Sequence, residues 1–179
     1  GLVMVGSRIP FAAAAVFCLF TAACASMPDD SASYQPTQHQ PGMVPGGMQC
    51  VTYARARTGI AIYGDAVDWW GKSDGLYAHE QSPLLGSILV LTGYAGPRHG
   101  HLAVVTSMVS DREIKVDHAN WLNDGAVFTD DPVLDVSDSN DWSAVRVWNP
   151  RADAWGTKVY PVQGFIGPGR DDPRVALAD

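Results

Sequence analysis

The stretch that decides the fold is HLAVVTSMVSDREIKVDHA, residues 101–119. It holds two runs rich in Val and Ile, His101–Val109 and Glu113–Ala119, separated by Ser110-Asp111-Arg112, a short polar connection typical of a tight turn. The pattern predicts two antiparallel strands joined as a hairpin.

Helix-like sequence precedes this hairpin, and further strand-like runs surround it. The first expected helix runs from Cys50 to Thr58 and ends at Gly59, which favours a left-handed cap, and a second short helix begins at Asp65. Helices first and strands afterwards predict an α+β fold, with N-terminal helices packed on a small antiparallel β-sheet. The other expected strands are Ser87–Thr92, Ala144–Trp148 and Val159–Ile166.

A long acidic segment, residues 122–142, lies between two of the expected strands. A calcium loop needs oxygen ligands at alternate positions, a glycine turn and a closing acid, and this segment lacks that frame. We therefore expect a solvated acidic loop without a metal. Its acids are Asp124, Asp130, Asp131, Asp135, Asp138 and Asp141.

Residues 1–24 differ in kind from the rest of the chain. Arg8 precedes the apolar run Ile9–Phe20 and a group of small residues, an order typical of a secretory signal peptide. The Ala-Ala-Cys that ends at Cys24 is similar to the lipobox of bacterial lipoproteins, so Cys24 is a candidate lipidation site and lipid anchor. Simple cleavage near Ala25 is the alternative. We expect export, and the destination is the periplasm, the outer membrane as a lipoprotein, or the exterior as a secreted protein.

The remaining chain is expected to hold one folded domain. Residues 25–47 are rich in Ser, Gln, Pro and Gly and predict a disordered tether, followed by a domain over 48–168 and a C-terminal tail over 169–179. The chain has 12 basic and 19 acidic residues, a net charge of −7, which argues against nucleic acid as a partner. We expect a monomer without a cofactor.

Cys50 is the candidate nucleophile. It is the cysteine that remains when Cys18 and Cys24 in the export segment are set aside. The first turn of a helix favours a thiolate, because its unpaired N–H groups and dipole lower the thiol pKa. The backbone N–H of Cys50 and the side chain of Gln49 are candidate donors to an oxyanion. A small, buried and inert cysteine is the alternative.

A base must accept the proton of the thiol, and two histidines compete for that role. His101 lies on an expected strand, whereas His99 lies in a turn rich in Gly and Pro. A strand holds an imidazole in a fixed geometry better than such a turn does, so His101 is the favoured base. Two aromatic residues near the proposed catalytic residues in sequence, Tyr94 and Trp121, are candidates for substrate binding.

A third group must orient the base, and three residues are candidates. Side chains alternate along residues 114–120, so His118 and Asn120 are expected to point toward the core or cleft and Asp117 away from it. His118 or Asn120 would then orient His101. A β-bulge would make Asp117 the partner instead.

Taken in order, Gln49-Cys50 at a helix start, Gly86–Val90, Gly100–Val105 and Ile114–Trp121 resemble the CHAP domain, the cysteine- and histidine-dependent amidohydrolase/peptidase family. The resemblance implies a papain-like fold. It also implies hydrolysis of amide bonds in bacterial peptidoglycan through an acyl-enzyme, by an N-acetylmuramoyl-L-alanine amidase or an endopeptidase. Many members carry Glu-x-Asn where this chain has His118-Ala119-Asn120, and Cys-His-His is familiar from related NlpC-like peptidases. Some members bind calcium through acids before the cysteine, and residues 39–49 contain none.

Two other functions fit the same residues. The first is a metal-dependent hydrolase, since His99, His101, Asp117 and His118 are ligand types that zinc accepts. The second is a catalytically silent lipoprotein that binds the cell wall, favoured by the histidine that replaces the usual carboxylate at position 118.

Overall fold

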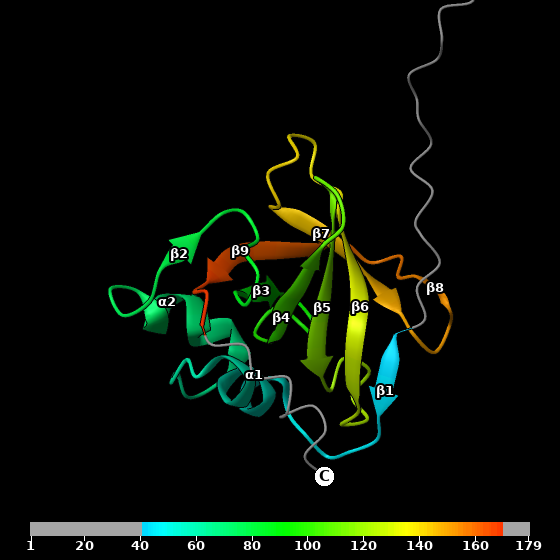
Figure 1. The fold of residues 1–179 in the computed structure, drawn as a ribbon, viewed down its shortest axis with the longest axis horizontal. Coiled ribbons are helices and arrows are strands. Elements are labelled where there is room, and N and C mark those ends of the chain that lie inside the picture. Colours follow the sequence, from blue (N-terminus) through cyan, green and yellow to red (C-terminus); the bar gives the residue numbers. More distant parts are fainter. Residues whose placement is uncertain (1–40, 170–179) are drawn as a thin grey trace, which may run out of the picture. The chain divides into compact units, whose positions relative to one another are not determined.

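The computed structural model describes residues 41–169, and these residues form a six-stranded antiparallel barrel (Figure 1). The strands follow the order β6–β5–β4–β3–β9–β7 around the barrel, and the pairing of β6 with β7 closes the ring. The bounds are β3 Ile88–Thr92, β4 Gly100–Met108, β5 Glu113–Ala119, β6 Val127–Asp135, β7 Ala144–Asn149 and β9 Tyr160–Ile166.

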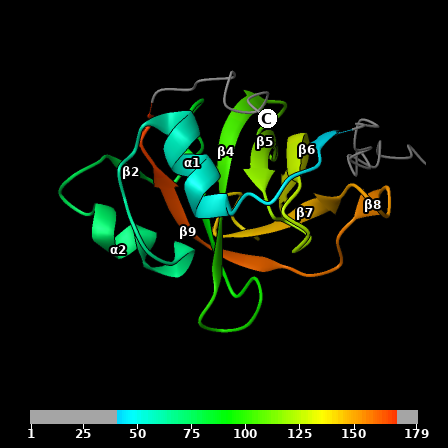
Figure 2. The same ribbon diagram turned by 90° about the horizontal axis from the view of Figure 1, so that it is seen from below.

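Within residues 41–169, three short strands extend the barrel and two short α-helices lie outside it. Strand β1 (Gly42–Val44) pairs with β6, β2 (His79–Glu80) with β9, and β8 (Ala154–Trp155) with β7. The helical elements are α1 (Cys50–Thr58), the 3-10 turn η1 (Ala66–Asp68) and α2 (Trp69–Ser73). In Figure 2, α1 lies across the outside of β4 beside β5.

The expected α+β, papain-like class with helices packed on a small sheet is wrong, because the described chain is mostly β and closed into a barrel. The difference arises in residues 122–142, whose acids predict a solvated loop. These residues contain β6, which pairs with both β5 and β7. Two of the acids, Asp131 and Asp135, are buried.

Several local expectations are confirmed. Helix α1 has the predicted bounds, and Gly59 ends it with a φ of 73° and an N–H that donates to Arg55 O. Strands β4 and β5 pair as the predicted antiparallel hairpin. The strand Gly42–Val44 lies within the segment expected to be a disordered tether, so this end of the segment is part of the sheet.

The expected signal peptide with Cys24 lies outside the described residues, as do most of the tether and the tail from residue 170 onward. Neither helix within residues 41–169 has the length and apolar character needed to cross a membrane.

Apart from a small cluster of Tyr53, Ala119 and Val127, most buried apolar side chains of the described residues form one cluster inside the barrel and another outside it. On β4, Ala103 and Val105 belong to the inner cluster, whereas Leu102 and Val104 belong to the cluster that the helical elements cover. Because side chains alternate along a strand, His101 shares the inward face of β4. The two clusters therefore place an imidazole at the inner rim of the barrel, next to the layer that carries α1.

Candidate active site

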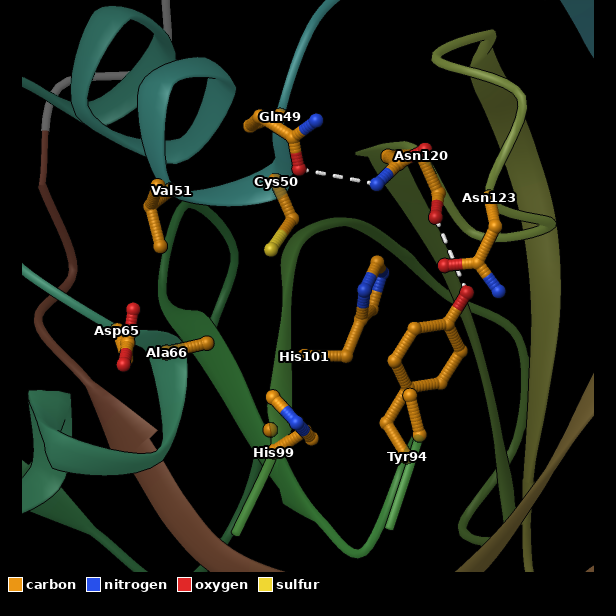
Figure 3. Close-up of a pocket in the computed structure, with 12 residues that line it drawn as sticks. Gln49, Cys50, Val51, Asp65, Ala66, Tyr94, His99, His101, Asn120 and Asn123 are labelled. Carbon is orange, nitrogen blue, oxygen red and sulfur yellow. Dashed lines mark hydrogen bonds between the residues drawn. The ribbon is translucent and has the colours of Figure 1, made fainter.

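Cys50 and His101 lie in the same cleft. Cys50 is the first residue of α1, and His101 is near the start of β4; both line a cleft of about 300 Å³ (Figure 3). Figure 3 shows the sulfur of Cys50 on the side of the helix that faces the ring of His101. The structure therefore brings together the two residues predicted to be the nucleophile and the base.

A buried ion pair fixes α1 against the barrel. Arg57 Nη1 is 2.6 Å from Asp117 Oδ2 on β5 and 2.6 Å from the hydroxyl of Tyr53. The other oxygen of Asp117 accepts from the backbone N–H of Asp130 at 2.8 Å. Because loss of one partner leaves a buried charge uncompensated, this contact holds the helix, and with it Cys50, in one orientation.

The ion pair also decides the orientation of Asp117. The register of β5 against β6 shifts between Val116 and His118, which is the irregularity that could have turned Asp117 toward the base. Asp117 nevertheless faces Arg57 and not His101. The expectation that it points away from the cleft is confirmed.

Behind His101 lies a buried chain of hydrogen bonds. His101 Nε2 is 3.0 Å from His118 Nδ1, and His118 Nε2 is 2.8 Å from Asp131 Oδ2. The exposed fractions of these residues are 1%, 1% and 0%, so water does not compete for the contacts. His118, and not Asn120, is the residue bonded to His101.

The directions of these two hydrogen bonds follow from Asp131, the last of the three bonded residues. An ionised Asp131 only accepts, so His118 Nε2 donates to it, and the Nδ1 of a neutral His118 then accepts from His101 Nε2. This arrangement leaves the Nδ1 of a neutral His101 without a proton. His101 Nδ1 is therefore the nitrogen that can take a proton from Cys50.

Burial sets the charge states of the catalytic pair. It lowers the pKa of His101 well below its usual range, and the neighbouring His118 lowers it further. Burial also raises the pKa of the Cys50 thiol, an effect larger than the opposite influence of the N–H groups of Leu102, Val51 and Cys50 itself. The expectation of a lowered thiol pKa is therefore wrong, because desolvation of the half-buried residue outweighs the effect of the helix start. Both shifts favour a neutral thiol and a neutral imidazole in the free protein.

Burial also acts on the carboxyl of Asp131. It raises the pKa of Asp131, and the hydrogen bond and charge of His118 oppose that rise. The nearby Asp117 adds to the increase, because two negative charges repel each other.

The two aromatic candidates occupy different positions. The ring of Trp121 stacks on His118, with centroids 5.3 Å apart, and its Nε1 donates to Trp148 O at 3.2 Å. Trp121 is buried and does not line the cleft of Cys50. Tyr94 does line that cleft, with its ring 4.9 Å from that of His101 and its hydroxyl bonded to the backbone oxygens of Asn120 and Trp121.

Asn120 connects the end of β5 to the start of α1. Its Nδ2 donates to Gln49 Oε1 at 3.0 Å, and its Oδ1 accepts from the N–H of Gly125 at 2.9 Å. Both Gln49 and Asn120 line the cleft. In Figure 3 the amide nitrogen of Gln49 points away from the sulfur, so Gln49 as placed is a structural link. The backbone N–H of Cys50 remains the better placed of the two predicted oxyanion donors.

The four residues of the metal alternative do not converge on one point. Asp117 is paired with Arg57, and His101 and His118 are hydrogen-bonded to each other. Across residues 41–169, no group of three or more His, Cys, Asp or Glu side chains is arranged to hold a metal ion.

Sequence reasoning missed Asp131. The residue lies next to Pro132, and proline argues against the interior of a strand. Only the pairing of β6 with β5, in which Asp131 lies opposite Val116, brings the carboxylate behind His118. No local pattern in the sequence signals that contact.

A cysteine at a helix start that shares a cleft with a hydrogen-bonded histidine defines the class of site found in cysteine hydrolases. Residues 39–120 match the family model described as CHAP domain, which confirms the resemblance drawn from the sequence for this part of the chain. CHAP domains are typically hydrolases that act on peptidoglycan. The match includes Cys50, His101 and His118 and ends before β6 and Asp131. No curated protein and no solved structure matches the chain.

Proposed function

We propose that this protein is a cysteine hydrolase that cleaves an amide bond of bacterial peptidoglycan, as an N-acetylmuramoyl-L-alanine amidase or an endopeptidase. The observation that carries the proposal is the buried chain from His101 through His118 to Asp131, which begins in the cleft of Cys50. A structural cysteine has no need of an oriented, unprotonated imidazole beside it. The family match supplies the substrate class.

The first chemical step forms a thioester. His101 Nδ1 takes the thiol proton as the sulfur of Cys50 attacks the amide carbonyl, and the S–C bond forms. The backbone N–H of Cys50 donates to the oxyanion that results. Protonated His101 then gives its proton to the departing nitrogen, the C–N bond breaks, and the amine leaves.

The second step reverses the proton transfers. Water replaces the amine, His101 takes a proton from it, and the hydroxyl attacks the thioester carbonyl. The C–S bond breaks, the thiol of Cys50 recovers its proton from His101, and the carboxylic acid leaves. The charge on His101 in both steps is balanced by Asp131, which acts through His118.

We also propose that the protein works outside the cytoplasm as a monomer. Residues 1–24 would act as the export signal, and Cys24 would carry the lipid that anchors the chain to the outer membrane. Incorporation of a labelled fatty acid tests this, with Cys24→Ser as the comparison. Label that persists in Cys24→Ser would exclude that anchor, and label in neither protein would favour a periplasmic or secreted form.

The catalytic proposal is tested by digestion of purified peptidoglycan with the full-length protein, read by mass spectrometry. Wild type should produce new termini that identify the cleaved bond. Cys50→Ala and His101→Ala should each reduce their formation by at least about a thousandfold, since removal of a nucleophile or its base has effects of that size or larger.

The same experiment separates the silent wall-binding alternative. A folded wild type that leaves peptidoglycan intact, yet sediments with it as Cys50→Ala also does, would favour that alternative. Termini that Cys50→Ala produces at the wild-type rate would exclude the thiol mechanism.

A further inference from the structure

We propose that the carboxylate of Asp65 binds a free ammonium group of the peptide substrate, close to the bond that is cleaved. This inference rests on the proposed hydrolase function and specifies its substrate. Asp65 precedes η1 and lines the same cleft as Cys50 and His101. Among the residues of the described range 41–169 that line this cleft, it is the only Asp or Glu.

The carboxylate of Asp65 is available to a ligand. Although Asp65 is at the N-cap position of η1, its side chain makes no capping hydrogen bond. Two cations of neighbouring elements are held by other groups. Lys72 Nζ donates to Tyr63 O at 3.1 Å and lies 3.4 Å from Asp68 Oδ2. Arg55 donates to Ile62 O at 3.3 Å.

The cleft has two sides of different chemical character. Figure 3 shows Val51, Asp65 and Ala66 on one side of the catalytic pair, and Tyr94, Asn120 and Asn123 on the other. The three residues named on the second side carry no charged group, and His99 also lines the cleft. A cationic group of a substrate that occupies both sides is therefore drawn to the side of Asp65.

Asp65 is held at a fixed place relative to the catalytic strand. A Cβ built on Gly100 would lie 2.8 Å from the backbone nitrogen of Val67, so η1 packs directly on β4 beside His101. Since Asp65 is the residue immediately before η1, this contact places its backbone close to β4. A group bound there has a defined position relative to the attacked carbonyl.

The peptides of peptidoglycan carry ammonium groups of two kinds. One is the α-ammonium of a free peptide N-terminus, and the other is the side-chain ammonium of a diamino acid. Both present the same cation to a carboxylate, so Asp65 selects for charge. Acetylation of either amine removes that charge and leaves the scissile amide unchanged.

If the digest shows cleavage within the peptide, the experiment compares four synthetic stem peptides that contain the cleaved bond. If it shows cleavage of the muramoyl–alanine amide, the α-amine is part of the scissile bond, and two muramoyl peptides are compared, with the side-chain amine free or acetylated. The four stem peptides differ as follows. They carry both amines free, the α-amine acetylated, the side-chain amine acetylated, or both acetylated. The full-length wild type should cleave peptides with the recognised amine free with a kcat/KM about five- to tenfold higher than their acetylated forms, with the difference in KM. The amine whose acetylation alone lowers kcat/KM is the one that Asp65 binds.

Asp65→Asn should cleave free and acetylated peptides equally, because the amide keeps the shape of the side chain and loses its charge. Asp138→Asn is the matched control. Asp138 is exposed and lies in the loop that follows Asp135, and Ala119 pairs with the opposite end of β6. Asp138→Asn makes the same charge change and should keep the wild-type preference.

Two outcomes overturn the inference and leave the hydrolase intact: wild type cleaves all four peptides alike, or Asp65→Asn keeps the preference. If wild type cleaves none of them, the affinity of each peptide for the Cys50→Ala variant is measured instead, and it decides whether the ammonium site exists. Tighter binding of the free-amine peptides that is lost when Asp65→Asn is added supports the ammonium site, and the peptidoglycan digest decides the hydrolase proposal separately. Equal binding of all four peptides overturns the ammonium site.

Discussion

Asp131 Oδ2 lies 2.8 Å from Nε2 of His118, and neither residue has an exposed fraction above 1%. The carboxylate thereby determines which nitrogen of His118 carries a proton, and through His118 which nitrogen of His101 is free. A residue of β6 controls the base on β4 without contacting the substrate cleft. Asp131 is thus a positioning residue.

Asp131→Asn is expected to reduce kcat by about a hundredfold or more. The amide NH2 would donate to His118 Nε2, reverse both hydrogen bonds and place a proton on the nitrogen of His101 that must act as base. Kinetics with the digest substrate measure the change in kcat, and NMR of the imidazole nitrogens reports the tautomers. An unchanged kcat with altered tautomers would show that the direction of the chain has no role in catalysis.

The Cys50 thiol is expected to react slowly with iodoacetamide at neutral pH. Burial raises the pKa of Cys50, so the thiolate population grows only as the pH approaches and exceeds the ordinary thiol range. The measurement is the alkylation rate from pH 5 to pH 10, followed by mass spectrometry. A rate that is already maximal at pH 6 would contradict this picture and indicate a resting thiolate–imidazolium pair.

Stability is expected to fall on the acid side because of His101. Its pKa is lowered in the folded state, so between the folded value and the ordinary value of about 6.5 the unfolded chain binds more protons. The contribution of His101 to the free energy of unfolding is fully present above about pH 6.5 and is lost as the pH falls below that value. Urea unfolding from pH 4 to pH 8 measures this slope, and His101→Gln should flatten it. The same slope in His101→Gln would assign it to other groups.

Arg57→Ala is expected to cost about 3–5 kcal/mol in the free energy of unfolding, because it leaves Asp117 buried without its cation. Activity should fall as well, since α1 carries Cys50. Urea unfolding with the exposed pair variant Arg151→Ala as control, expected within about 1 kcal/mol of wild type, tests the difference. Equal losses in the free energy of unfolding for the two variants would show that the ion pair does not anchor α1.

Gly100→Ala is expected to destabilise the protein by about 1–3 kcal/mol and to reduce activity. The added Cβ would lie 2.7 Å from Leu91 O and 2.8 Å from Val67 N, so β4 and η1 must move apart next to His101. Gly71→Ala is the matched control, because its Cβ meets no atom within 4 Å and the site is helical. Thermal unfolding and kcat/KM of the two variants decide, and similar values would contradict the close packing.

The parts of the structure that follow from local sequence are the parts that could be predicted. Helix α1 with its glycine cap, the β4–β5 hairpin and the position of Cys50 at a helix start all depend on residues that are close together in the sequence. Closure of the barrel depends on the pairing of β6 with β7. Strand β6 was not predicted, because its Pro132 and its acidic residues are untypical of a strand. Asp131 was missed for the same reason. The raised thiol pKa depends on tertiary burial, which outweighs the local effect of the helix start.

The nucleophile and the base belong to different layers: Cys50 to a helix outside the barrel, and His101 to the inner face of a barrel strand. The helical layer rests on two smaller clusters and the buried ion pair of Arg57 with Asp117, whereas the barrel is closed by hydrogen bonds all the way around. Partial opening of the outer layer would separate thiol from imidazole while the barrel persists. On heating, inactivation would then come before the loss of β structure, and the intermediate would be an intact barrel with an exposed, unassisted sulfur.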